Sequence, residues 1–356
     1  MIHLFGYSIT FYVFLATVFG IGLLVFIHEL GHFLMAKKFK IRVEQFAFGF
    51  GPEIIGFTYG DTRYSICAIP LGGFVKMPGE DVSSATGSPD EFMSQPWHRR
   101  LIIAFFGPLM NYILAVVIFT VVFYFWGFSV PSEKPVIGDI MDGYPAKVAG
   151  LASGDIVRKI NGTATNTWEQ MADLIHKSAL TKVRIDILRD GKEFAFSITP
   201  SKDPVSNAGI IGIAPMIETR KVTLGGSFVL GVKMVVFQTV YTIKYLGMKI
   251  IHWEKPEVAG PIGVVQLLAK AAKSGIENLL HFLAVISVAL GLFNLFPIPL
   301  VDGGHIMLAL IEAATRKPLN KTAVQASNFV GLTIIVFIFI FATYSDLARM
   351  GLKFLK

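Results

Sequence analysis

The chain has 356 residues, of which 53% are hydrophobic and only 16% are charged. Because ordinary soluble domains carry about 25% charged residues, this composition excludes a disordered protein and a typical soluble enzyme, and indicates a membrane protein. The single cysteine, Cys67, excludes an intramolecular disulfide and a cysteine-based metal cluster. The net charge of +7 fits basic loops that orient a membrane protein better than it fits nucleic-acid binding.

Four stretches of the chain contain no Asp, Glu, Lys or Arg and are long enough to cross a bilayer, which takes about 20 apolar residues in a helix. We predict transmembrane helices at Phe5 to Ile27, Leu101 to Val130, Asn278 to Val301 and Ala323 to Ser345. The first stretch lacks the basic start and the small-residue exit of a signal peptide. It continues directly into His28 and Glu29, so we interpret it as a helix of the mature protein.

A fifth apolar stretch, Phe228 to Ile250, is interrupted by Lys233, Lys244 and Lys249. Each charge at the centre of a spanning helix costs at least ~2.5 kcal/mol. We therefore predict an amphipathic helix that lies at the membrane surface, within an interfacial region from residue 220 to 275.

The orientation follows from the basic residues of the short loops, because these residues favour the cytoplasmic side. Two loops are basic, and their residues are Lys37, Lys38, Lys40, Arg42, Arg63, Lys76, Arg99 and Arg100 in one and Arg316, Lys317 and Lys321 in the other. With these loops in the cytoplasm, the polar insert from Ser132 to Thr219 lies outside. Val183 to Leu188 and Phe194 to Ile198 flank an Asp190-Gly191 turn there, which predicts a β-hairpin.

The first predicted span ends in His28-Glu29-Leu30-Gly31-His32, an H-E-x-x-H pattern. On a helix, His28 and His32 share one face and reach one metal ion, while Glu29 lies close enough to take a proton from a water on that metal. Imidazole suits zinc, which lowers the pKa of such a water to about 7. A chance match and a pair of interfacial capping histidines are the alternatives. Ionisable groups at membrane depth are costly, which favours the metal site.

A third ligand is needed, and Asp302 is the first carboxylate after the third predicted span. Pro297 and Pro299 break the helix before it, and non-helical backbone at membrane depth is tolerated only where it is buried or lines a wet cavity. Asp302-Gly303 is also a strong turn signal, so a turn at the boundary remains the alternative. If Phe228 to Ile250 crossed the membrane, Asp302 would face away from the histidines, so the metal site and the interfacial helix support each other.

The same residues resemble the site-2 protease family of intramembrane zinc metalloproteases, most closely the bacterial RseP type. The H-E-x-x-H motif of that family matches His28 to His32. Its N-x-x-P-x-P-x-L-D-G element matches Asn294, Pro297, Pro299, Asp302 and Gly303, with Val301 in place of the usual Leu. Three further family elements match Gly107, Pro108 and Asn111; Phe46, Gly49, Phe50 and Gly51; and Leu71 to Met77.

The resemblance covers nearly the whole chain and implies a zinc endopeptidase. His28, His32 and Asp302 would hold Zn²⁺, and Glu29 would be the catalytic base. The implied fold is an α-helical integral membrane protein with four transmembrane helices, a membrane-associated β segment and a small α+β PDZ domain between helices 2 and 3. The expected regions are 1–127 with the β segment at about 41–77, 132–219 for the PDZ domain, 220–275 and 276–356.

The segment from Ile41 to Met77 alternates like strands at Ile41 to Phe46 and at Tyr64 to Ile69, with glycines between them. A plain cytoplasmic hairpin explains this pattern. The resemblance instead implies a sheet beside the zinc whose edge binds the unwound substrate by β-addition. Asn111, Asn294, Gly49, Gly51, Pro297 and Pro299 are the expected substrate-binding residues. For the two asparagines, hydrogen bonds between helices are the alternative.

The external insert resembles a PDZ domain of bacterial envelope proteases, with an expected peptide-binding loop at Gly150, Leu151 and Gly154. The implied substrates are single-pass membrane proteins such as anti-sigma factors or remnant signal peptides. The implied location is the bacterial inner membrane, in contact with lipid, with the active site toward the cytoplasm and the PDZ domain outside. A PDZ-bearing scaffold with a structural metal site and a metal transporter are the rival functions. Glu29 argues against the first, and the clustering of the ligands at one depth argues against the second.

Overall fold

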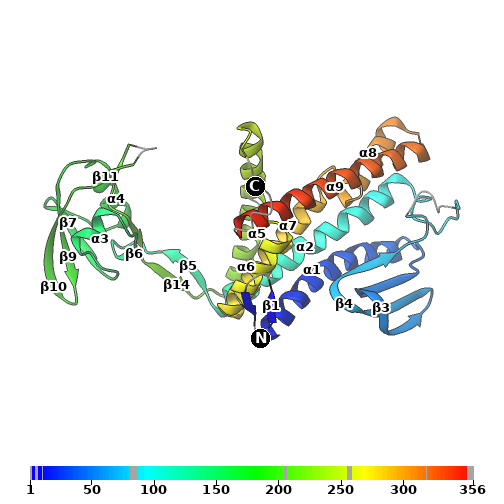
Figure 1. The fold of residues 1–356 in the computed structure, drawn as a ribbon, viewed down its shortest axis with the longest axis horizontal. Coiled ribbons are helices and arrows are strands. Elements are labelled where there is room, and N and C mark those ends of the chain that lie inside the picture. Colours follow the sequence, from blue (N-terminus) through cyan, green and yellow to red (C-terminus); the bar gives the residue numbers. More distant parts are fainter. Residues whose placement is uncertain are drawn as a thin grey trace. The chain divides into compact units, whose positions relative to one another are not determined.

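The computed structural model describes residues 2–4, 7–9, 11–80, 86–203, 207–254, 259–317 and 319–350. The chain divides into two compact units, one made of Met1–Phe125 with Thr223–Lys356 and the other of Trp126–Val222. Figure 1 shows the helices gathered in the first unit and a small β-rich body in the second. The insert predicted at Ser132 to Thr219 lies inside the second unit, which extends a few residues further at each end.

Five described helices of the first unit are long and apolar enough to cross a membrane. They are α1 (Phe11–Lys38), α2 (Trp97–Phe125), α5 (Leu224–Ile251), α7 (Ile276–Asn294) and α9 (Lys321–Arg349). Two shorter helices are α6 (Pro261–Lys273) and α8 (Asp302–Thr315). Four of the long helices coincide with the predicted spans, and α5 is the one for which the lysines predict an interfacial position.

The ends of the predicted spans are less accurate than their existence. Strands β1 (Ile2–Leu4) and β2 (Tyr7–Ile9) pair before α1, which begins at Phe11, while Phe5 lies outside the described residues. Helix α2 ends at Phe125, so Val130 belongs to strand β5 (Phe128–Pro131). The absence of charge marks an apolar segment but does not separate helix from strand, which explains both errors.

A long hairpin follows α1 and consists of β3 (Gln45–Tyr59) and β4 (Thr62–Lys76). It folds over itself, because residues 45–48 of β3 pair with 63–66 of β4 on one side and with 73–76 on the other. Gly49 and Gly51 have φ of +89° and +84°, a conformation that glycine adopts without strain, and they bend β3 where its pairing changes. The predicted strands were too short because this bend hides the strand period.

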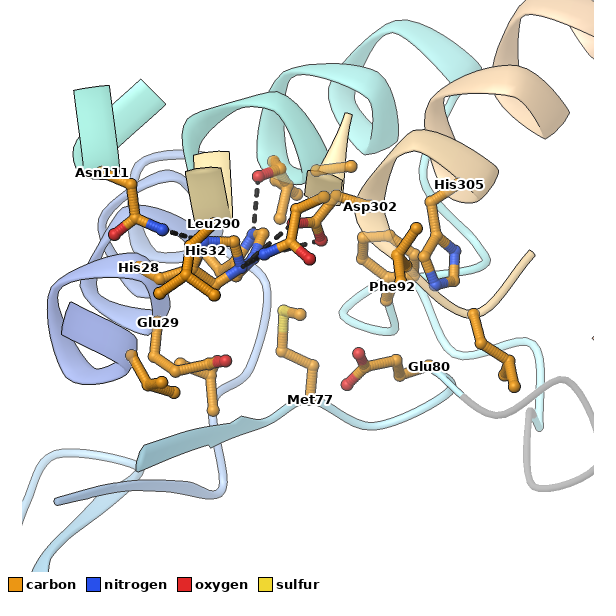
Figure 2. A pocket seen from close by; sticks show the side chains of 17 residues that line it. His28, Glu29, His32, Met77, Glu80, Phe92, Asn111, Leu290, Asp302 and His305 are labelled. Carbon is orange, nitrogen blue, oxygen red and sulfur yellow. Dashed lines mark hydrogen bonds and ion pairs between the residues drawn. The ribbon is translucent and has the colours of Figure 1, made fainter. Parts of the chain in front are cut away.

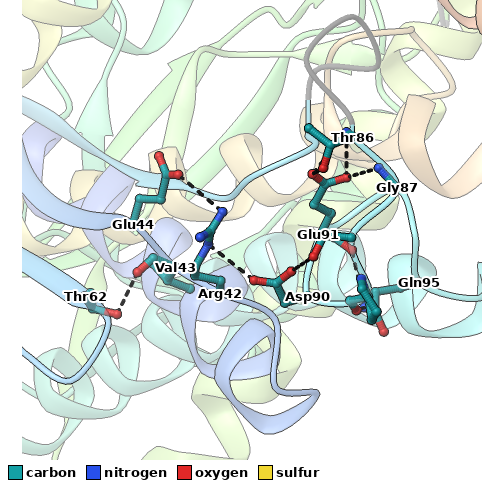
Figure 3. A network of polar contacts seen from close by, with 11 residues as sticks. Arg42, Val43, Glu44, Thr62, Thr86, Gly87, Asp90, Glu91 and Gln95 are labelled. Carbon is teal, nitrogen blue, oxygen red and sulfur yellow. Dashed lines mark hydrogen bonds and ion pairs between the residues drawn. The ribbon is translucent and has the colours of Figure 1, made fainter.

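The hairpin packs on α1 through aromatic side chains. Phe46 stacks on both Phe26 and Phe33, with ring centroids 4.9 and 4.6 Å apart. Beside it, Arg42 pairs with Glu44 and Asp90, and the Glu91 carboxylate accepts hydrogen bonds from Thr86 and Gly87 (Figure 3). This polar network holds residues 86–95 against the base of the hairpin.

The second unit contains a four-stranded sheet in the order β10-β9-β7-β8, built from Lys192–Ile198, Val183–Arg189, Ile156–Ile160 and Thr163–Ala164. The predicted hairpin is confirmed, because β9 and β10 pair across a turn at Asp190 and Gly191, which have φ of +50° and +77°. The second unit also contains two short helices, α3 (Pro145–Ala149) and α4 (Trp168–His176). Three further pairs of strands complete it: β6 (Ile137–Ile140) with β13 (Ile213–Pro215), β5 with β14 (Ile217–Arg220), and β11 (Ser201–Lys202) with β12 (Gly209–Ile210).

The second unit has its own apolar core, in which the inward faces of the sheet meet the two short helices. Met171 of α4, Ile160 of β7 and Ile185 of β9 are almost completely buried there. The core also contains Ile137, Ala146, Leu151, Val157, Ile175, Val183, Ile187, Ile198 and Ile211.

Candidate metal centre

His28 and His32 lie in the second half of α1, one helical turn apart and on one face. Both side chains are buried, and their Nε2 atoms are 3.2 Å apart. Two imidazole nitrogens this close, in a helix that is apolar over most of its length, are costly to bury without a shared partner.

Asp302 completes a triangle with the two histidines. It is the first residue of α8, and its carboxylate oxygens lie 3.0 Å from Nε2 of His28 and 3.3 Å from Nε2 of His32. The chain reaches this position after α7 ends at Asn294, through the segment with Pro297 and Pro299. Leu300 has a φ of +79°, which is strained for a leucine, and strained backbone of this kind is concentrated at functional sites.

These distances fit one zinc ion. With Zn–N and Zn–O bonds of 2.0–2.2 Å, the ligand atoms of a tetrahedral site are separated by about 3.3 Å. The three separations here, 3.2, 3.0 and 3.3 Å, match that value. Three protein ligands also leave the fourth position of a catalytic zinc open. Within the described residues, His28, His32 and Asp302 form the only group of three such side chains that could hold an ion.

Helix α2 holds the His32 imidazole through its Nδ1 atom, on the side of the ring away from the metal position. The Nδ1 atom of His32 lies 2.8 Å from the carbonyl oxygen of Ile103, so Nδ1 carries the proton and donates it. The Nε2 atom then presents its lone pair to the metal position, which is the usual arrangement of a metal-bound histidine. Gly107 makes this approach possible, because a Cβ atom there would lie 2.3 Å from Nε2 of His32 and 2.9 Å from Cε1 of His28.

A cavity of about 310 Å³ opens beside the three side chains, and Glu29 lies in its wall (Figure 2). Val75 of β4 lines the same cavity as Glu29, so the hairpin forms part of the wall next to this carboxylate. The lining also includes Val25, Met77, Glu80, Phe92, Ile103, Ala104, Asn111, Leu290, Asn294, Leu300, Val301 and His305. The cavity therefore combines the metal position with a carboxylate that can accept a proton.

Glu80 and His305 are two cavity residues to which sequence reasoning gave little or no role. Glu80 keeps access to solvent at the cavity, yet loss of hydration there raises its pKa to about 7. Burial lowers the pKa of His305, so its imidazole is neutral at neutral pH, and its ring packs edge-on against Phe92. Glu80 follows the Leu71 to Met77 element directly, and that proximity is the signal that could have indicated it.

The predicted substrate-binding residues fall into two groups. Asn111 and Asn294 line the cavity, with Nδ2 atoms 3.2 Å from Nδ1 and 3.4 Å from Nε2 of His28. Gly49 and Gly51 do not line it and instead bend β3. Pro297 and Pro299 also lie outside the lining; Pro299 packs against the first turn of α8 and against α9.

Comparison with known proteins shows the family of this chain. The model of peptidase family M50 matches residues 16–338. The chain belongs to this family. It is 34% identical over 345 residues to a protein of Clostridium acetobutylicum that is named a zinc metalloprotease, covering 95% of this chain and 98% of the relative. This M50 peptidase is accordingly a zinc metalloprotease of the site-2 protease family.

Two further relatives carry the name RasP. The zinc metalloprotease RasP of Geobacillus kaustophilus is 28% identical over 409 residues, and the regulator of sigma-W protease RasP of Bacillus subtilis is 28% identical over 412. Each alignment covers 93% of this chain and at least 96% of the relative. A PDZ domain of the SdrC-like protein of Listeria monocytogenes aligns with 24% of this chain and 88% of its own, at 24% identity and a TM-score of 0.21.

The loop expected to bind peptides in the second unit has no free backbone donors at the predicted positions. The amides of Gly150, Leu151 and Gly154 donate to the carbonyls of Lys147, Ala146 and Ile137. Asp155 closes the loop further, because its buried carboxylate accepts from the Ala152 amide and from the Arg189 guanidinium. The geometry therefore argues against a peptide-binding loop at Gly150 to Gly154.

A groove of about 360 Å³ lies elsewhere in the second unit, between α4 and residues 209–213. Its lining is mostly apolar and consists of Met141, Tyr144, Trp168, Met171, Ala172, Ile175, His176, Gly209, Ile210, Ile211, Gly212 and Ile213. Among the described residues, the amides of Ile211 and Gly212 have no backbone acceptor. An apolar slot beside two adjacent free N–H groups is suited to an apolar chain end with its carboxylate.

Proposed function

We propose that this M50 peptidase is an intramembrane endopeptidase that hydrolyses peptide bonds in or near the transmembrane segment of single-pass membrane proteins. His28, His32 and Asp302 hold the zinc, and Glu29 is the general base. The convergence of three ligand atoms with separations of 3.0–3.3 Å, beside a cavity walled by Glu29, carries this proposal. His28, Glu29 and His32 lie within the apolar helix α1, and Asp302 begins α8 a few residues after the apolar helix α7.

The chemistry divides between the metal and the chain. The zinc supplies a Lewis acid that activates water and polarises the scissile carbonyl. Glu29 takes the proton of the attacking water and passes it to the leaving amine. Val75 of β4 lines the cavity together with this carboxylate. Asn294, whose Nδ2 lies beside His28, is placed to donate to a carbonyl of the bound substrate.

A substrate helix must unwind before it is cut, because its carbonyls are bonded within the helix. Residues 73–76 of β4 pair with β3 on one side, and among the described residues no strand pairs with their other edge. Val75 of this same edge lines the cavity that contains Glu29, so a strand added there would pass close to the catalytic base. We propose that the unwound substrate binds this edge by β-addition, which replaces its lost backbone bonds.

The proposed topology has four spans, with α5 at the outer surface. Gly231 of α5 packs on α2 at Val116 and Thr120, about 20 Å along the helix from Gly107. After α5, the amides of Gly260 and Gly263 donate to Asp346 of α9, about 22 Å beyond the contact of Gly331 with Pro299. Both flanks of α5 thus lie at the end of the bundle away from the metal, which supports a surface helix over a fifth span.

The sidedness follows from the basic loops and this topology. The metal lies at the cytoplasmic end of the bundle, and the second unit lies outside. The Bacillus subtilis relative is named a regulator of sigma-W protease, which supports a membrane-bound anti-sigma factor as one substrate class and is compatible with remnant signal peptides as another. We further propose that the second unit is a PDZ domain whose groove between α4 and residues 209–213 binds exposed peptide ends.

The test is cleavage of a single-span test substrate by the purified full-length protein in detergent. Glu29→Gln removes the base but keeps the size of the side chain, so cleavage should fall by about 10²- to 10⁴-fold. Glu277→Gln, in the first turn of α7 and outside the cavity lining, is the matched control and should cleave like the wild type. Zinc content should be equal in all three proteins, because Glu29 is not a ligand.

Two outcomes would contradict the proposal. Equal cleavage by wild type and Glu29→Gln would show that Glu29 is not the base or that another protease is present. Absence of cleavage by a wild type loaded with zinc, over several single-span substrates, would favour a scaffold or a transporter. For the groove, a fluorescent peptide with an apolar free C-terminus should bind the full-length protein, and its amidated form should not.

A further inference from the structure

One face of α2 carries three residues spaced four apart, Ile103, Gly107 and Asn111, and all three meet the metal-ligand histidines. The carbonyl of Ile103 accepts from His32, and the missing side chain of Gly107 leaves room for both imidazoles. Residues at this spacing lie above one another on a helix. Asn111 therefore lies at the Nδ1 atom of His28, just as the carbonyl of Ile103 lies at the Nδ1 atom of His32.

Asn111 is completely buried, and its amide lies 3.2 Å from Nδ1 of His28 (Figure 2). Its backbone is held as well, because Ser287 of α7 donates to its carbonyl oxygen over 2.8 Å. A side chain fixed in this way cannot move away to adapt to different substrates. This rigidity fits a residue that orients another side chain.

The orientation of the amide follows from the protonation of His28. A neutral imidazole that offers the Nε2 lone pair to a metal carries its proton on Nδ1, so the neighbour of Nδ1 must be an acceptor. Rotating the Asn111 amide by 180° exchanges its nitrogen and oxygen, which places Oδ1 next to Nδ1 without moving any other atom. Before the rotation Oδ1 has no hydrogen-bond partner, and after it Nδ2 would have none. Each orientation therefore leaves one amide atom unpaired, and the protonation of His28 decides between the two.

We infer that Asn111 is a positioning residue for His28: its Oδ1 accepts the Nδ1 proton, which fixes the tautomer and directs Nε2 to the zinc. This inference rests on the proposed ligand set and changes the expected role of Asn111 from substrate contact to metal binding. Asn294 differs, because its amide lies near Nε2, on the side of the metal and the cavity, and keeps the substrate role.

The experiment measures the zinc affinity of the purified full-length protein by competition with a chelator, so it needs no catalysis. Asn111→Leu keeps the volume and removes the acceptor, and it should bind zinc about 10- to 100-fold more weakly. Asn111→Ala, a smaller side chain that leaves more freedom to fold, should lose affinity similarly. Asn111→Asp retains an acceptor and should restore affinity to within a few-fold of wild type. Asn328→Leu, the same substitution on α9 and outside the cavity lining, is the matched control and should bind zinc like the wild type.

Several results would overturn the inference. Wild-type zinc affinity in Asn111→Leu and Asn111→Ala, together with a raised KM for cleavage, would make Asn111 a substrate-binding residue. Equal weakness of Asn111→Asp and Asn111→Leu would indicate a packing role instead. His28→Ala is measured in the same series: unchanged zinc affinity there would refute the ligand set itself, an outcome distinct from failure of Asn111 alone.

Discussion

The cavity of the helical unit and the groove of the second unit are similar in size and opposite in chemistry. The first, about 310 Å³, is lined by His28, Glu29, His32 and Asp302 among long apolar helices. The second, about 360 Å³, is lined mainly by Met, Trp and Ile side chains and ends at two free amides. Polar groups therefore concentrate where the surroundings are most apolar, which is where they are costliest and most informative about function.

The two sites also differ in how the chain assembles them. Two ligands and the base of the metal centre come from a single turn of α1, and α2 supports them from one face. The groove is assembled from α4 and a loop more than thirty residues later, with no repeated spacing that relates them. A site built on one helical period is more easily predicted from sequence and is also more sensitive to a single change.

The largest effect is expected at Gly107, where the two ligand histidines meet α2. Gly107→Ala places a methyl group 2.3 Å from Nε2 of His32, and the ring can yield only by leaving the metal position. Zinc affinity should fall by at least about 100-fold, and cleavage should disappear. Gly247→Ala in α5, where a Cβ atom meets nothing within 4 Å, is the control. Retention of zinc by Gly107→Ala would mean that the site is not built on this crossing.

Sequence reasoning predicts the candidate metal centre because H-E-x-x-H is a local pattern with a fixed period. Asp302 is 270 residues from His32, and on spacing alone a turn residue remained an equal alternative. Family resemblance pointed to it, and α8 places it beside the histidines. Sequence reasoning did not find α8, because the turn signal at Asp302-Gly303 hides the start of a helix that this aspartate begins.

The sequence also predicts a peptide-binding loop whose backbone donors are already used within the folded unit. Both Gly150 to Gly154 and Gly209 to Gly212 contain glycines beside apolar residues, and sequence composition does not show which amides are free. In the folded unit, the amides of the first loop donate to carbonyls of α3 and β6 and to Asp155, whereas the amides of Ile211 and Gly212 in the second loop have no backbone acceptor among the described residues. Free donors are a property of tertiary structure, so no local pattern reports them.

A loss of stability and zinc affinity of intermediate size is expected when the ion pair between α8 and α2 is removed. Arg100 pairs with Glu312 in a mostly buried position, and its Nε donates to the carbonyl of Gln95. Arg100→Met leaves Glu312 without its partner charge and should lower the free energy of unfolding by about 3 kcal/mol. Because Glu312 and Asp302 share α8, zinc affinity should fall as well.

The exposed pair of Arg63 and Glu53 on the hairpin is the control for this prediction. Arg63→Met should change stability by no more than about 1 kcal/mol, since surface ion pairs contribute little. Thermal unfolding and zinc competition on the same preparations measure both effects. A loss of stability at Arg100 without any loss of zinc would show that Asp302 is held by the Pro297 to Val301 segment rather than by the tie to α2.

The smallest effect is expected in the groove, where binding is spread over many apolar contacts. Ala172→Glu puts a charge into the lining between α4 and residues 209–213, and the affinity for an apolar peptide end should fall at least about tenfold, or 1.4 kcal/mol. Val148→Glu, on the exposed surface of α3 close to Gly150, should leave that affinity unchanged. If Val148→Glu weakens the peptide and Ala172→Glu does not, the loop at Gly150 to Gly154 is the binding site after all. Neither change should alter zinc affinity, because both residues belong to the second unit and none of the proposed ligands does.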